Sequence, residues 1–76
     1  MPDLPSITGN AAIKAFSKDG FELDRIRGSH HILKRLGHRF LLSVPVHGQQ
    51  CVKPGTLRSL IRVSGLTIEQ FIELLD

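Results

Sequence analysis

The residues best suited to chemistry in this sequence stand together in the segment Arg27-Gly28-Ser29-His30-His31. The segment joins a guanidinium, a glycine, a hydroxyl and two imidazoles. An imidazole near its ordinary pKa can both take up and release a proton at neutral pH, which is what cleavage of a phosphodiester without a metal ion requires. We therefore treat this segment as the candidate catalytic one, for which the rest of the chain must supply a fold and a substrate.

Two other kinds of site are poorly matched by the residues around the histidines. His30 and His31 are adjacent and would point to opposite faces of a strand, and no Asp, Glu or second Cys lies in the window Arg25–Thr67 to complete a metal site. A catalytic triad built on Ser29 would have to take its acid from upstream of that window. We expect no metal ion and no other cofactor.

Metal-free cleavage of RNA requires fewer groups from the protein, because the 2′-hydroxyl of the RNA is itself the nucleophile. His30 would act as general acid or base, and the turn at Gly28 and Ser29 would offer backbone amides and a hydroxyl to a phosphate. Positive charge for the phosphoryl oxygens would come from Arg27 with Lys34, Arg35 or Lys53. On spacing alone, ordinary strand histidines on a polar face are the simpler interpretation.

The charge distribution favours a phosphate-bearing partner. The chain carries 10 basic and 7 acidic residues, yet Arg25–Thr67 contains eight of the basic residues and none of the acidic ones. Such a segment is typical of a surface that attracts phosphates or an acidic partner protein. The candidate catalytic segment lies inside it.

Length and composition predict a single domain over residues 1–76 in the cytoplasm. A chain of 76 residues has no room for a second module. No apolar run approaches the roughly 18 residues that a bilayer requires, so we expect no membrane contact. The amino-terminal residues do not resemble a secretory signal, and the single cysteine, Cys51, suits a reducing compartment.

Capping and periodicity signals predict three helices. The first spans about residues 9–19, with Thr8 as its N-cap. The second opens at Thr56 and stops at Gly65, after the loop 47–55. Thr67 begins a capping box that leads into a short last helix.

Between the first two helices, the pattern changes to that of three strands. In the first strand, Phe21, Leu23 and Arg25 alternate with Glu22, Asp24 and Ile26. The second runs from His30 to Lys34 or Arg35, and the third has an inward face of Phe40, Leu42, Val44 and Val46. Short connections make these an antiparallel sheet in a two-layered α+β fold, with the helices on one face and the basic segment on the other face or its rim. Alternation leaves open whether His30 or His31 faces solvent.

Four blocks of sequence resemble, in order, the HicA/YcfA-like family of toxins. They are Gly20-Phe21-Glu22-Leu23 with Arg27-Gly28-Ser29-His30-His31-Ile32, then Val44-Pro45-Val46-His47, then Lys53-Pro54-Gly55-Thr56-Leu57-Arg58-Ser59-Leu60-Ile61, then Ser64-Gly65-Leu66 with Phe71. The resemblance implies a double-stranded-RNA-binding-domain-like α-β-β-β-α fold and an mRNA interferase activity in a type II toxin–antitoxin pair. It also implies a HicB-like antitoxin as partner and His30 as the catalytic residue.

The resemblance is weaker at other positions. His31 fills a variable position, and His47 is either a supporting residue or a structural one at the strand end. The segment Lys53-Pro54-Gly55-Thr56-Leu57 is first a helix entry and second a phosphate or partner contact. The turn Arg35-Leu36-Gly37-His38 departs from the family's usual proline-aspartate-glycine form. An RNA-binding module of the same fold that does not cut RNA is the alternative function.

Overall fold

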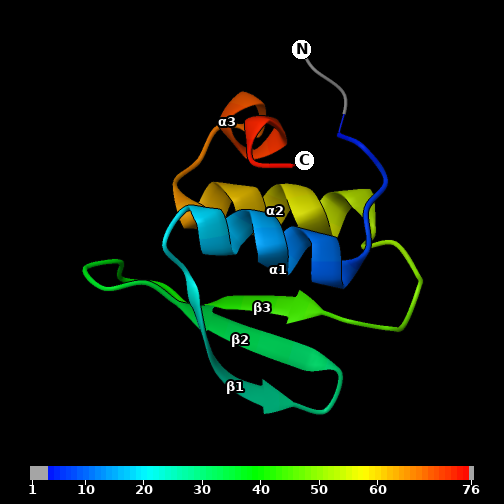
Figure 1. The fold of residues 1–76 in the computed structure, drawn as a ribbon, viewed down its shortest axis with the longest axis horizontal. Coiled ribbons are helices and arrows are strands. Elements are labelled where there is room, and N and C mark those ends of the chain that lie inside the picture. Colours follow the sequence, from blue (N-terminus) through cyan, green and yellow to red (C-terminus); the bar gives the residue numbers. More distant parts are fainter. Residues whose placement is uncertain (1–3, 76) are drawn as a thin grey trace.

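The computed structural model describes residues 4–75, so the ends of the predicted domain, 1–3 and 76, lie outside it. The elements are α1 (Gly9–Lys18), β1 (Glu22–Arg27), β2 (His30–Lys34), β3 (Leu42–Pro45), α2 (Pro54–Ser64) and α3 (Ile68–Glu73). The strands form one antiparallel sheet in the order β1-β2-β3 (Figure 1). The predicted α+β class and the order of the elements are confirmed.

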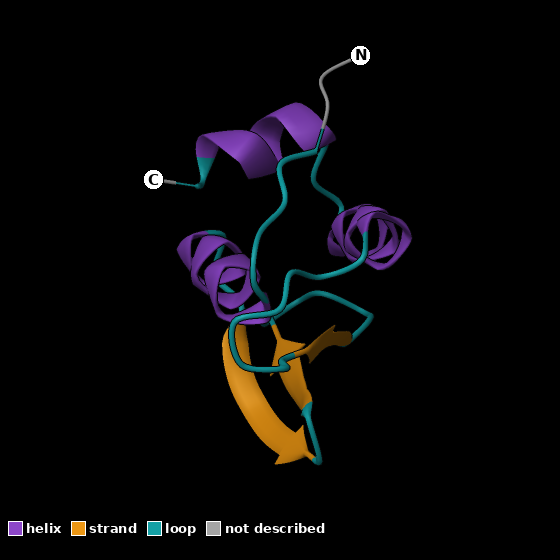
Figure 2. Ribbon diagram, turned by 90° about the vertical axis from the view of Figure 1, so that its right-hand side faces the viewer, coloured by secondary structure: helices purple, strands orange, loops and turns teal. Residues whose placement is uncertain are grey.

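The helices lie on one side of the sheet. Helices α1 and α2 run side by side over its β3 edge, and α3 lies on their far side, away from the strands (Figures 1 and 2). The short last helix thus adds a partial third layer to the two that we expect from the sequence. Strand β1 projects beyond the helices, which leaves both of its faces exposed.

The core lies between the helices and the sheet, with Phe16 at its centre. The Phe16 side chain is fully buried, and its ring lies 5.9 Å from that of Phe21 and 5.0 Å from that of Phe71 between centroids. These three rings join α1 to the start of β1 and to α3. The other fully or nearly fully buried apolar residues are Ala12, Ala15, Leu33, Leu42, Val44, Leu57 and Ile61.

The predicted helix ends are largely those observed. Thr8 accepts a hydrogen bond from the backbone N–H of Ala11 at 3.2 Å, and Gly65 ends α2 with a φ of 88°. Thr67 and Gln70 form both bonds of the capping box that opens α3. Residues at these ends therefore supply the capping interactions that their types predict, Thr8 and Thr67 through side chains and Gly65 through its backbone.

The prediction that α2 starts at Thr56 is wrong by two residues. The helix begins at Pro54, and Lys53 takes the N-cap position without a side-chain hydrogen bond. Proline suits the first position of a helix, because its φ is already helical and the N–H that it lacks would have no partner inside the helix. The signal of Pro54 outweighs that of the hydroxyl at Thr56.

Two predicted strand faces are also wrong. Phe40 lies before β3 and is 56% exposed, because the chain bends at residues 39–40 before the strand starts. In β1 a bulge between Leu23 and Arg25 inserts one extra residue, Asp24. Leu23 therefore shares a face with Ile26 instead of Arg25, as a single inserted residue reverses the alternation beyond it.

Gly9 allows α1 to lie against the end of β3. A Cβ atom at this position would overlap the carbonyl oxygen of Pro45 and come within 2.9 Å of Cγ2 of Val46. We expect Gly9→Ala to lower the free energy of unfolding by about 1 to 3 kcal/mol, since backbone must move to relieve the overlap. Urea titration would measure the loss.

Gly55→Ala is the matched control for this change. Gly55 also lies in the first turn of a helix, but a Cβ atom there meets nothing within 4 Å. Alanine is the better helix former, so this variant should be no less stable than the parent protein. Equal stability of the two variants would contradict the close approach at Gly9.

Candidate active site

His30 is the first residue of β2 and stands directly after the two-residue turn at Gly28 and Ser29. Gly28 has a φ of 61°, the left-handed conformation that such a hairpin turn favours and that glycine adopts without strain. His30 pairs with Arg27 on one side and with Pro45 on the other. Its side chain is exposed, on the sheet face opposite the helices.

His31 points the other way, toward the helices. It pairs with Val44, which is fully buried, and two residues on, Leu33 pairs with Leu42 on the same face. The Nδ1 atom of His31 is buried, and no hydrogen-bond partner for it lies among residues 4–75. His30 is therefore the imidazole of this pair that a large substrate can reach.

A pocket of about 290 Å³ brings together residues that are far apart in the sequence. It opens beside β3, between the start of β2 and the first turn of α2. Its lining includes His30, Ser43, His47, Cys51, Lys53 and Thr56. Three of the candidates named from the sequence thus share one cavity, namely the possible acid or base, the possible supporting histidine and a lysine.

The loop 46–53 forms one wall of the pocket and is anchored at both ends by backbone hydrogen bonds. The N–H of Val46 donates to the carbonyl of Ser29 at 2.7 Å, and the N–H of Val52 donates to the carbonyl of Ile7 at 2.8 Å. The first bond ties the loop to the turn before His30, and the second ties it to the segment before α1. The loop is therefore held in place although it contains no helix or strand.

One hydrogen bond links His30 to the neighbouring strand. The Nδ1 atom of His30 lies 3.0 Å from Oγ of Ser43. Nothing in the sequence patterns singles out Ser43. For the other ring nitrogen of His30, Nε2, no hydrogen-bond partner lies among residues 4–75.

The remaining candidates lie at different distances from the pocket. Arg27 is exposed on β1 and stands across from His30. Lys34 is at the opposite end of β2, roughly 13 Å along the strand, where its Nζ atom lies 3.4 Å from a carboxylate oxygen of Asp24. It lines a separate hollow of about 620 Å³ together with Arg35. The structure thus separates Lys34 from the other candidates.

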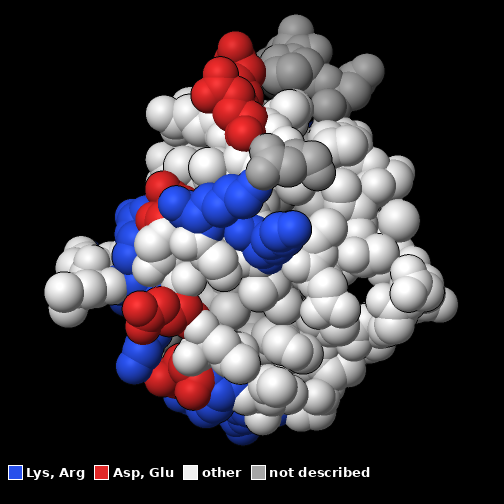
Figure 3. All heavy atoms as spheres, viewed as in Figure 1, with Lys and Arg blue, Asp and Glu red and all other residues white. Residues whose placement is uncertain are grey.

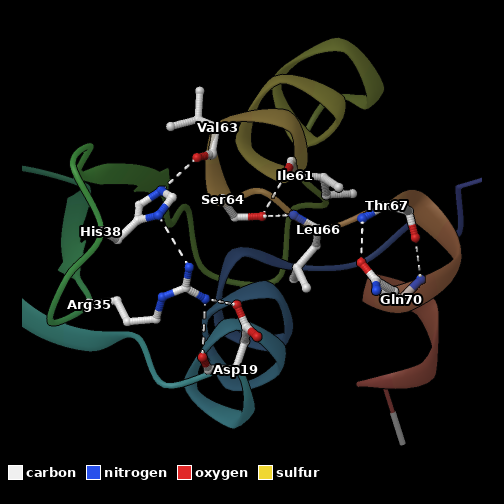
Figure 4. Close-up of polar contacts among 9 residues, drawn as sticks. All are labelled: Asp19, Arg35, His38, Ile61, Val63, Ser64, Leu66, Thr67 and Gln70. Atoms are coloured by element: carbon white, nitrogen blue, oxygen red, sulfur yellow. Dashed lines mark hydrogen bonds and ion pairs between the residues drawn. The ribbon is translucent and has the colours of Figure 1, made fainter.

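His38 belongs to a structural network at that second hollow (Figure 4). Its Nε2 donates to the carbonyl of Val63 at 2.7 Å, and its Nδ1 accepts from Arg35 at 3.2 Å. Arg35 also forms an ion pair with Asp19. The network fastens the loop after β2 to the C-terminal ends of α1 and α2. Both nitrogens of this imidazole are therefore occupied.

The absence of acids from the window Arg25–Thr67 does not make an acid-free surface. Asp19 and Asp24 precede the window in sequence but pair in space with Arg35, and with Arg25 and Lys34. Figure 3 shows basic and acidic side chains lying next to each other over the left half of the face that it draws. Near the pocket the balance of charge is more positive, because Arg27 and Lys53 have no acidic partner within 4 Å among residues 4–75.

Residues 4–75 contain neither a cluster of metal ligands nor a membrane-spanning helix. No three His, Cys, Asp or Glu side chains there are grouped so that they could hold a metal ion. No helix in this part of the chain is long and apolar enough to cross a membrane.

Comparison with known proteins yields one family. A family model described as the HicA toxin of bacterial toxin-antitoxin matches residues 9–66, which include the whole sheet and every residue of the pocket named above. A search of curated proteins finds no significant match.

Proposed function

Because the chain belongs to the HicA toxin family of bacterial toxin–antitoxin systems, we propose that it is a metal-independent endoribonuclease that cleaves mRNA. The observation that carries this proposal is the shared pocket of His30, His47 and Lys53. An exposed imidazole beside a cation is the minimum that transfer of an RNA phosphoryl group requires.

In the proposed reaction His30 acts first as general base. Its Nε2 atom takes the proton of the ribose 2′-hydroxyl, whose oxygen forms a bond to phosphorus while the bond from phosphorus to the 5′-oxygen breaks. The products are a 2′,3′-cyclic phosphate and a 5′-hydroxyl. The departing 5′-oxygen needs a proton, which His47 in the same pocket or a water molecule can deliver.

The cations have separate tasks in this scheme. Lys53, in the pocket, would stabilise the charge that develops on the phosphoryl oxygens, and Arg27 would hold the RNA beside His30. The turn at Gly28 and Ser29 would contact the same backbone through its amides. Lys34, at the far end of β2, would meet a phosphate further along the RNA strand.

Incubation of the purified protein with single-stranded RNA in EDTA tests the proposal. We expect cleavage that leaves cyclic phosphate ends, and no cleavage of the same RNA carrying 2′-O-methyl groups, since these block the nucleophile. Salt-sensitive binding without cleavage would instead identify an RNA-binding module that does not cut. Cleavage that disappears in EDTA would contradict the metal-free mechanism.

The toxin–antitoxin family implies an antitoxin partner. We propose that this partner is a HicB-like protein that covers the pocket, and that both act in the cytoplasm, where mRNA is found. An adjacent reading frame whose product copurifies with the toxin and stops RNA cleavage would support this assignment. A product that copurifies but leaves cleavage unchanged would contradict it.

A further inference from the structure

We propose that Ser43 is the positioning residue of His30, holding the imidazole by Nδ1 so that Nε2 is presented to the RNA. This inference rests on the proposed function and adds a residue to it. The observation behind it is the distance of 3.0 Å between Nδ1 of His30 and Oγ of Ser43.

The register of the sheet explains why these two side chains meet. His30 pairs with Pro45 and Ile32 pairs with Ser43, so Ser43 is the diagonal neighbour of His30. Both side chains stand on the face opposite the helices, and diagonal neighbours on one face of a sheet are within reach of longer side chains. Since strand pairing fixes the backbone of both residues, the contact does not depend on a mobile loop.

A hydroxyl group suits this task because it can accept as well as donate a hydrogen bond. For His30 to act as base, Nε2 must be unprotonated and Nδ1 must carry the hydrogen, which the hydroxyl oxygen of Ser43 then accepts. When Nε2 takes up a proton, the bond from Nδ1 is unchanged. The ring thus keeps one orientation through uptake and release of the proton.

A neutral partner also fits the substrate. No carboxylate lies within 4 Å of His30 in the part of the chain that the structure describes, so the usual acidic partner of a catalytic imidazole is replaced here by a serine. A carboxylate next to the pocket would repel the RNA phosphate, whereas the Ser43 hydroxyl orients the ring without adding negative charge.

Three variants test this role in the EDTA cleavage assay. Ser43→Ala should lower kcat about three- to tenfold, the range that a single neutral hydrogen bond carries, with little change in KM. Ser43→Thr keeps the hydroxyl and should restore most of the rate. Ser59→Ala, which removes an exposed serine on α2 outside the pocket, should cleave like the parent protein.

Nitrogen NMR of the imidazoles provides a readout that does not depend on cleavage. The signals of His30 should change tautomer balance in Ser43→Ala and return in Ser43→Thr, while those of His38, held by Val63 and Arg35, should not move. An unchanged kcat with unchanged His30 signals would overturn the inference. If the parent protein does not cut RNA, the proposed function fails, and the His30 signals alone decide whether Ser43 sets the tautomer.

Discussion

His30→Ala is expected to cleave RNA about 10²- to 10⁴-fold more slowly than the parent protein, the usual contribution of one general acid or base. His31 faces the helices and His38 bonds Val63 and Arg35, so neither can take its place. His47 shares the pocket, but the proposed mechanism assigns it to the leaving oxygen instead of the 2′-hydroxyl. A fluorogenic RNA in EDTA measures the rate. Since His30 is exposed, the variant should fold normally, and its circular dichroism should match that of the parent.

His31→Ala is the natural comparison for this result. The substitution removes an imidazole from the next position in the chain, but from the opposite face of the sheet. The folded variant should therefore cleave RNA at nearly the parent rate. Expression in cells gives a second readout, in which the parent protein stops growth and His30→Ala does not. Equal toxicity of the parent and His30→Ala would remove His30 from the mechanism.

Phe16→Ala should lower the free energy of unfolding by about 3 to 5 kcal/mol. The side chain is fully buried against Phe21 and Phe71, and alanine would leave a cavity where three parts of the fold meet. A domain of 76 residues has a total stability of only about 4 to 11 kcal/mol at typical values per residue. Much of this margin would be lost. Thermal and urea unfolding measure the change.

Phe40→Ala removes the same ring from a different environment. Phe40 is 56% exposed and precedes β3, near the ring of His38, so its loss should cost less than about 1 kcal/mol. The contrast between two phenylalanines in one small domain tests the assignment of the core directly. Comparable losses at both positions would show that Phe40 belongs to the core, as its place in the alternating pattern suggests.

The sequence predicts well those features that depend on a few neighbouring residues. Thr8, Gly65 and Thr67 mark helix ends through their own side chains or backbone freedom, and these ends are observed. The errors in the predicted strands arise where the structure depends on contacts between residues that are far apart in the sequence. The bulge at Asp24 and the bend before β3 depend on how strands pair, and no local pattern encodes them.

In the candidate site, too, features set by neighbouring residues could be predicted, and features set by strand pairing could not. His30 could be singled out by its segment and by the family that the chain resembles, whereas Ser43 could not. The two-residue turn before His30 sets the register of β1 against β2. The register of β2 against β3 depends instead on the loop 35–41, which joins them, and its length alone does not specify a pairing. Only that second register places Ser43 beside the imidazole.

The assembly of the pocket from β2, β3, the loop 46–53 and the start of α2 has a consequence for the timing of toxicity. A nascent chain that ends at Pro45 already contains His30 and Ser43, but it lacks Lys53 and the part of the core that α2 supplies. Such a chain has neither the complete pocket nor the packing that holds its walls together. The RNA cleavage proposed above would therefore begin only after synthesis has passed the second helix.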